Sequence, residues 1–275
     1  MRKGSLMREQ AARGWVARGR WAAVASCVAA ASFLSATAAA RSADMPTTPA
    51  ESFPEPFAAH YVAAWRDISV GTSDLQLERD SQPGHYHYTW TISARGVFRL
   101  AYSHDVTQQS WFGVLDNHVR PEHYRGEEGS STVAFAFDWD TGHAFGSSEG
   151  KPIDLPLKPG AQDLMSIQVE IMLDLKNGAM PPTFNIIDKD QMKEFLYTRE
   201  GTAKLQTEIG TLDTVIVASR HTATDSRVLR MWFAPELGYV PVQAERSRDG
   251  KLEFAMRIKT LTRAGVSYPQ TTADN

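Results

Sequence analysis

Cysteine and excess basic charge are both scarce in this 275-residue chain. Cys27 is the single cysteine, so an internal disulfide framework is excluded. Lys and Arg number 29 against 32 Asp and Glu, a formal net charge of −3. This balance argues against a nucleic-acid binder, because such proteins need a basic surface to neutralise phosphates. The hydrophobic fraction of 42% supports a packed core and excludes global disorder.

Motifs that carry chemistry are also missing. The chain has no phosphate-binding glycine loop followed by lysine and no dinucleotide fingerprint. Gly146-Ser147-Ser148 has the composition of a loop or a strand end and gives no sign of a nucleophile. Asp138–Gly142 resembles the start of a calcium loop, but its glycine stands at the fifth position and the loop needs it at the sixth. We therefore predict no catalytic residue, no cofactor and no metal.

His85 and His87 are the candidate pair of metal ligands that this prediction of no metal must be weighed against. Alternate residues of a strand face the same way, and paired imidazoles can bind Zn or Cu. The sequence does not choose a third ligand among the remaining histidines, which are His60, His104, His118, His123, His143 and His221. An exposed strand face opposite Tyr86 and Tyr88 explains the pair more simply.

Residues 1–38 have the order of a secretory signal peptide. Six basic residues and one acid occupy the first twenty positions, an uncharged Ala-rich stretch follows, and small-residue triplets end it. An uncleaved membrane anchor is the alternative, since twenty residues can just span a bilayer. Few of these side chains are strongly apolar, which favours cleavage and a periplasmic protein without a membrane span. Removing residues 1–38 changes the formal net charge to −8.

Cys27 offers a second interpretation of the same segment. Val24-Ala25-Ser26-Cys27 resembles a bacterial lipoprotein cleavage box. Only six residues separate Arg20 from Cys27, which is too few for a normal apolar segment, and the apolar run continues past it. We therefore do not expect lipid anchoring through Cys27.

Composition divides the rest of the chain into three parts. Residues 39–56 are rich in proline and small polar residues, which predicts a disordered linker. Residues 57–263 show no repeat and no shift in composition, which predicts a single β-rich domain. Residues 264–275 are polar and predict a frayed tail.

Within the domain, short segments with period-two alternation are separated by turn signals, which is typical of antiparallel β-structure. The expected strands cover 60–65, 73–79, 86–92, 106–115, 132–139, 143–146, 184–187, 193–199, 203–208, 213–219, 227–233, 240–246 and 251–260. Apolar residues at helical spacing predict one helix over 163–176, with Asp163 as N-cap and Gly178 after its end. The fold class is mainly β: a curved antiparallel sheet or open barrel or sandwich, with one packed helix.

The sequence resembles an exported bacterial family catalogued as domain of unknown function 3108. The residues that carry the resemblance are Tyr61, Trp65 and Gly71, then Pro121, Asp163–Ser166, Glu208–Gly210 and, most specifically, Met231–Val242. The resemblance covers about the whole domain. It implies an envelope protein with a β-rich fold and brings neither an activity nor catalytic residues. Taken alone, Met231–Val242 indicates a strand, a proline turn and a return strand, pinned by buried aromatics.

Three functions fit these observations. The first is non-enzymatic binding of an apolar or amphipathic ligand, such as a lipid, or of an envelope protein, by aromatic side chains on a curved sheet. The candidate ligand-binding residues are Trp65, Tyr88, Trp90, Trp111, Trp232 and Tyr239. The second is a carboxylate-dependent enzyme acting on cell-wall or extracellular glycan, with two acids beside Trp90, Trp111 or Trp139. The third is a structural partner that carries a large exposed apolar patch.

Overall fold

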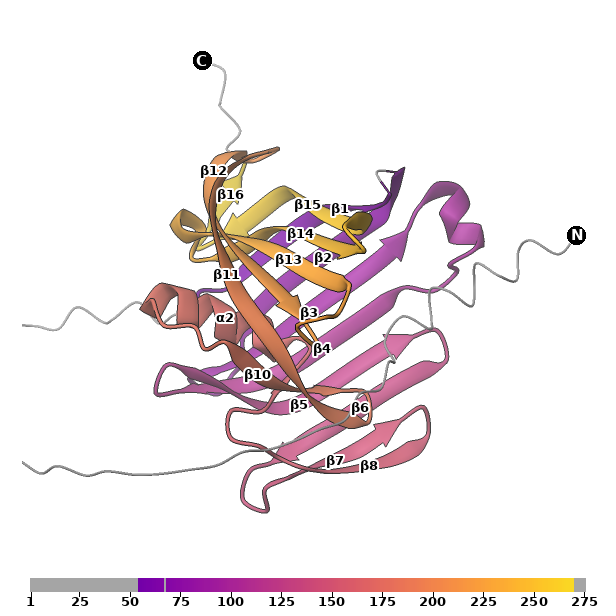
Figure 1. The fold of residues 1–275 in the computed structure, drawn as a ribbon, viewed down its shortest axis with the longest axis vertical. Coiled ribbons are helices and arrows are strands. Elements are labelled where there is room, and N and C mark those ends of the chain that lie inside the picture. Colours follow the sequence, from indigo (N-terminus) through magenta and orange to yellow (C-terminus); the bar gives the residue numbers. More distant parts are fainter. Residues whose placement is uncertain (1–53, 67, 270–275) are drawn as a thin grey trace, which may run out of the picture. The chain divides into compact units, whose positions relative to one another are not determined.

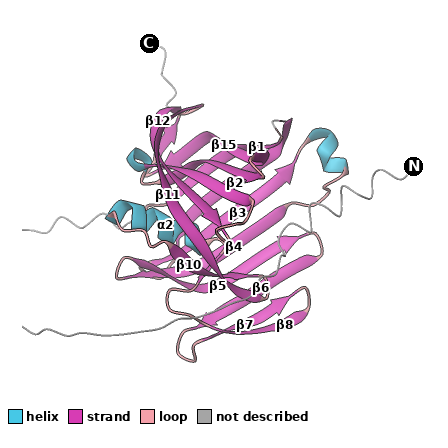
Figure 2. Cartoon of the chain, viewed as in Figure 1, coloured by secondary structure: helices cyan, strands magenta, loops and turns pink. Residues whose placement is uncertain are grey.

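A single curved sheet makes up most of the computed structural model, which describes residues 54–66 and 68–269 (Figure 1). The predicted signal peptide, its cleavage site and Cys27 lie outside the described residues. The described part is one compact unit of sixteen strands, with α2 (Ser166–Asn177) as its α-helix (Figure 2). The predicted fold class is therefore confirmed, and the sheet is open.

Chain order and strand order are closely related. The first eight strands are β1 (Phe57–Trp65), β2 (Ile68–Arg79), β3 (His85–Ala94), β4 (Val106–Leu115), β5 (His118–Glu128), β6 (Ser131–Asp138), β7 (His143–Ser148) and β8 (Lys151–Pro156). The other eight are β9 (Gln162–Asp163), β10 (Thr183–Asp188), β11 (Gln191–Thr207), β12 (Gly210–Arg220), β13 (Arg227–Ala234), β14 (Val240–Arg248), β15 (Lys251–Arg263) and β16 (Val266–Tyr268). Two 3-10 helices, η1 (Gly96–Leu100) and η2 (Pro235–Leu237), follow β3 and β13.

The sheet runs from β8 through β1 to β15 and on to β9, with β16 paired to β15. All described pairs are antiparallel except β9 with β10. The β1–β15 pair joins the two arms of the sheet. At the far end, β9 lies over β5, where the Gln162 side-chain amide donates to the carbonyl of Val119 at 2.9 Å. The sheet therefore curves back over one of its own faces, which we call the inner face.

Alternation decides which side chains point to the inner face. Tyr86 and Tyr88 on β3 are buried, as are Phe135 and Phe137 on β6, as the period-two pattern predicts. Their neighbours on the outer face are more exposed. Apolar burial of this kind stabilises the sheet by roughly 25 cal/mol per Å² removed from water.

The structure corrects the start of the helix. Asp163 pairs with Ile187 in the β9–β10 ladder, and α2 begins three residues later, at Ser166. The Asp163 carboxylate still accepts hydrogen bonds from the backbone N–H groups of Met165 and Ser166, at 2.7 and 2.8 Å. Such N–H groups otherwise have no partner at the start of a helix. Gly178 ends the helix with a φ of 75°, as expected for a residue in the left-handed region.

Several strands differ from the sequence prediction. Strands β5 and β8 were not expected, because Pro121 and Pro152 interrupt them and charged residues crowd β5. The expected strands 193–199 and 203–208 are one strand, β11, in which a register shift between Arg199 and Gly201 absorbs the break. Val266–Tyr268, in the segment expected to fray, pairs with β15.

The Met231–Val242 segment forms the corner that its sequence indicates. Phe233 and Val240 are fully buried, and η2 with Gly238 turns the chain between β13 and β14. The Tyr61 hydroxyl, buried on β1, donates to the carbonyl of Pro241 at 2.6 Å. This bond ties the corner to the middle of the sheet, because β1 lies two strands away from β14.

Gly71 is a position where the sheet leaves no room for a side chain. A Cβ atom built there would lie 2.1 Å from the backbone oxygen of Ser93 on β3. We expect Gly71→Ala to lower the free energy of unfolding by about 1–3 kcal/mol, because the two backbones must separate. Gly113→Ala is the matched control, since its Cβ would meet only side-chain atoms, of His85 at 3.3 Å and of Glu122 at 3.8 Å. Urea denaturation measures both, and equal losses would contradict the steric explanation.

Candidate functional site

The six predicted ligand-binding aromatics do not gather in one place. Tyr88 and Trp90 face inward from β3, where Tyr88 is fully buried and the Trp90 indole donates to Ser73 Oγ at 2.6 Å. Trp111 faces outward from β4 and stacks on His87, with ring centroids 4.4 Å apart. The other three lie at the end of β1, on β13 and after η2: Trp65, Trp232 and Tyr239. Their role in binding stays a prediction.

The inner face next to α2 is filled by the protein itself. Tyr61, Tyr88 and Phe112 from the sheet and Met165 and Met172 from the helix segment are almost without exposed surface. Two clefts have volumes of about 230 and 390 Å³. Of the six aromatics, only Tyr239 lines either cleft. Between these side chains and α2, the inner face therefore holds a packed core.

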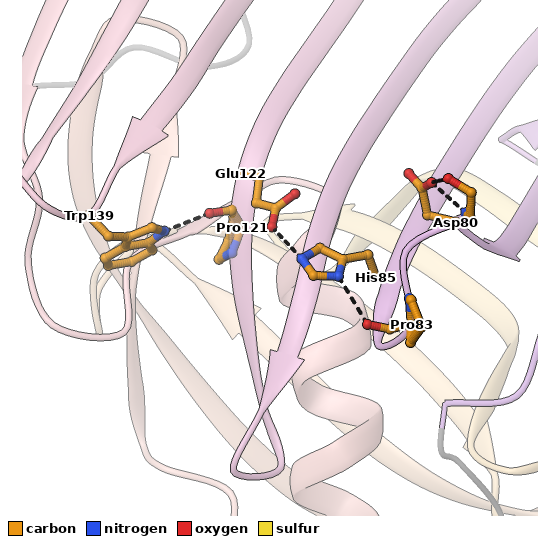
Figure 3. A network of polar contacts seen from close by, with 7 residues as sticks. Asp80, Pro83, His85, Pro121, Glu122 and Trp139 are labelled. Atoms are coloured by element: carbon orange, nitrogen blue, oxygen red, sulfur yellow. Dashed lines mark hydrogen bonds and ion pairs between the residues drawn. The ribbon is translucent and has the colours of Figure 1, made fainter.

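The histidine pair on β3 does not form a metal site among the described residues. His85 Nε2 lies 2.9 Å from a carboxylate oxygen of Glu122, and its Nδ1 lies 3.2 Å from the Pro83 carbonyl oxygen (Figure 3). His87 stacks on Trp111, and its Nε2 contacts Thr89 Oγ1 at 3.2 Å. These contacts agree with the simpler interpretation as a polar outer face.

A second group of titratable side chains lies where α2 packs on the start of β5. His118 Nδ1 is 2.8 Å from Glu170 Oε1, and the backbone N–H of Val119 donates to Glu170 Oε2 at 2.6 Å. Asp174, one helical turn after Glu170, completes a set whose ligand atoms all lie within 4.8 Å of one another. Burial, and next the charge of Glu170, raise the pKa of Asp174 to about 7. The hydrogen bond to Glu170, and then its charge, raise the pKa of His118.

Glu170 and Asp174 only partly meet the requirement of a glycan-cleaving enzyme, which needs two acids in a cleft beside an aromatic side chain. Asp174 lines the larger cleft together with Tyr197 and Arg199, but Trp90, Trp111 and Trp139 do not line it. No Gly-x-Ser-x-Gly nucleophile elbow was expected from the sequence, although Gly146–Gly150 has these letters. Ser148 ends β7 and leads through a two-residue turn into β8, so it does not lie on the strand-to-helix elbow of a hydrolase.

Asp163 is a third acid with an unusual environment. It is fully buried, with Ser110 Oγ donating to its carboxylate at 2.7 Å in addition to the two backbone N–H groups. Burial raises its pKa to about 6, although these hydrogen bonds work in the opposite direction. The carboxylate joins β4, β9 and α2 at the inner face and serves the fold.

Exposed apolar side chains concentrate at one end of the sheet, a feature that the sequence analysis missed. We define the apolar tip as the five large exposed side chains at the β1–β2 turn and around η1: Trp65, Ile68, Val97, Leu100 and Tyr102. The two segments adjoin, because the backbone N–H of Arg95 donates to the Val70 carbonyl at 2.9 Å, and Figure 1 shows η1 beside the β1–β2 end. Leu100 is 88% exposed and Val97 is 74% exposed.

Arginines surround the apolar tip. Arg66, Arg95 and Arg99 are all exposed, and Arg99 forms an ion pair with Asp105. The Arg66 guanidinium lies 5.9 Å from the Trp65 ring centroid. The tip thus combines aliphatic, aromatic and cationic groups, the set that suits the boundary between lipid chains and headgroups. Among the described residues, α2 included, no helix is long and apolar enough to cross a membrane.

Comparisons with known proteins identify a family and a fold. The family model described as "Protein of unknown function (DUF3108)" matches residues 57–256. No curated protein matches the sequence. A solved beta-barrel-like protein of the DUF1849 family from Brucella abortus has a TM-score of 0.50 at 12% identity, over 76% of this chain and 98% of its own. MucB in the Pseudomonas aeruginosa MucA/MucB complex has a TM-score of 0.34 at 10% identity, over 77% and 52%. The first comparison shows a shared fold.

The buried carboxylate of Asp163 predicts a pH dependence of stability. Its pKa is about 6 in the folded protein against an ordinary value of 3.8, so folding favours the protonated acid, and its contribution is lost as the pH rises through about 6. The shift corresponds to roughly 3 kcal/mol. We expect Asp163→Asn, which keeps the acceptor for both N–H groups, to gain about that much relative to the unmodified protein between pH 4 and pH 7, measured by urea denaturation.

Asp138→Asn is the control for the sign of this effect. Hydrogen bonds from Thr141 lower the pKa of Asp138, so its contribution is present at neutral pH and is lost as the pH falls through the lowered value. The Asn variant should therefore lose stability relative to the unmodified protein as the pH rises. A constant difference for Asp163→Asn across the whole range would contradict the predicted protonation.

Proposed function

Because this chain belongs to the family of unknown function DUF3108, which brings no activity with it, we propose a function from the surface of the domain: non-enzymatic binding to the lipid surface of the cell envelope through the apolar tip. The predicted signal peptide supplies the export that this function needs. The single observation that carries the proposal is that five of the nine large exposed apolar side chains among the described residues lie at one end of the sheet.

Three properties of the tip favour a lipid surface over a ligand held inside the sheet. The inner face beside α2 is packed, whereas the tip projects from the strand ends. Its most exposed members, Val97 and Leu100, lie on η1, which has no buried residue. Trp65 and Tyr102 carry a polar atom on an apolar ring, and the arginines can extend toward headgroups. Side chains of this kind enter an interface without a membrane-spanning segment.

Vesicle flotation tests the proposal with the chain from residue 39 onward, which contains the whole core cluster. We expect it to bind vesicles of phosphatidylcholine with phosphatidylglycerol. We expect the double variant Val97→Asp, Leu100→Asp to bind at least about tenfold more weakly, because transferring each apolar side chain from water is worth about 1.5–3 kcal/mol.

Leu115→Asp is the matched control, since Leu115 is 55% exposed and lies at the opposite end of β4. It should leave vesicle binding unchanged. Thermal unfolding of all variants checks that the fold is retained. Failure of the unmodified chain to float, or equal losses for the tip variant and Leu115→Asp, would refute the lipid-binding function.

A further inference from the structure

We propose that His118, Glu170 and Asp174 form a binding site for a divalent transition-metal ion, with Zn²⁺ as the expected ion, which fastens α2 to the start of β5. The site is separate from the apolar tip and does not rest on its function. The set combines one imidazole nitrogen with two carboxylates, the donor types that Zn²⁺ takes in proteins. Calcium and magnesium prefer oxygen ligands alone, so the imidazole argues against them.

The geometry is close to that of a bound ion. The three ligand atoms lie within 4.8 Å of one another. Metal–ligand bonds of about 2.0–2.2 Å at the tetrahedral angle place two ligand atoms about 3.4 Å apart, so the widest pair must close by up to about 1.4 Å. The His118 side chain is 69% exposed and makes this movement by giving up its 2.8 Å contact with Glu170 Oε1, whereas Glu170 and Asp174 are held by the buried helix.

An unsatisfied atom points to a missing partner. Asp174 is 4% exposed, and its Oδ2 is buried without a hydrogen-bond partner. Leaving a buried carboxylate oxygen unpaired is costly, and a cation beside it removes that cost. Glu170 already has an outer partner, since Oε2 accepts the Val119 N–H at 2.6 Å. Contacts of this kind hold metal-binding carboxylates in position in known sites.

The site has both an entrance and a charge that suit a metal ion. Asp174 lines the cleft of about 390 Å³ that opens between the end of α2 and β11, and His118 is exposed on the other side of the set. Two carboxylates opposite one imidazole leave negative charge for a dication to neutralise. The bound ion would bridge two segments about fifty residues apart in the chain, so binding should stabilise the fold.

Isothermal titration of ZnCl₂ into the chain from residue 39 onward, without a tag, tests the site. We expect one saturable site and a Zn²⁺-dependent rise in the midpoint of thermal unfolding. His118→Ala and Asp174→Asn should each weaken binding by at least about tenfold, because loss of an outer contact alone costs about 10–100-fold in known sites. His118→Ala alters an exposed side chain, so it tests the site even if Asp174→Asn does not fold.

His143→Ala is the matched control, because His143 forms another histidine–carboxylate pair, with Asp154 at 2.6 Å, on the exposed face of β7. It should bind Zn²⁺ like the unmodified chain. The proposal is overturned if no saturable binding occurs, if His118→Ala and Asp174→Asn bind as well as the unmodified chain, or if His143→Ala alone loses binding.

Discussion

The packing of α2 against the inner face of β4 and β5 is the contact that organises this domain. A sheet of this size needs a cover for one face, and α2 is the α-helix that the described chain provides. Nine of its twelve residues are buried, which is expected only when a helix is enclosed from several sides. The sheet achieves this by curving until β9 reaches β5. The inner face is therefore covered by the helix and packed against it.

Enclosing the helix also buries its acids. Glu170 and Asp174 occupy α2 positions that face protein, and each needs a partner in place of water. The Val119 backbone N–H and the His118 ring contact the Glu170 carboxylate. At the start of the helix segment, the Ser110 hydroxyl donates to the Asp163 carboxylate. Asp174 is left with an unpaired oxygen. The proposed metal site thus arises from the same burial that stabilises the fold.

Sequence patterns predicted the parts of the fold that depend on local chemistry. The alternation at Tyr86 and Tyr88 and the helix end at Gly178 both follow from neighbouring residues, and the structure has them. Strand β5 escaped prediction because Pro121 and many charges mask its period, while its pairing with β4 and β6 decides its conformation. The proposed metal ligands were not predicted as a group, because Glu170 and Asp174 lie within an apolar stripe of the helix. Only the tertiary fold brings His118 to them. The apolar tip was not predicted, because the sequence of η1 shows neither the two-residue alternation of a strand nor the spacing of an amphipathic helix.

The two proposed sites lie at opposite ends of the same strands. Strand β4 starts beside η1 and ends at Leu115, one turn before His118, so its ten residues separate the tip from the metal-binding set by roughly 30 Å. The two sites have no residue in common, since the tip is built from the β1–β2 turn and the η1 region and the other set from α2 and the start of β5. The tip can therefore enter a lipid surface without disturbing α2, and an ion at α2 stiffens the covered core without altering the tip. This separation explains how one small domain can expose apolar side chains at one end and keep a stable fold: the packing that stabilises it lies elsewhere.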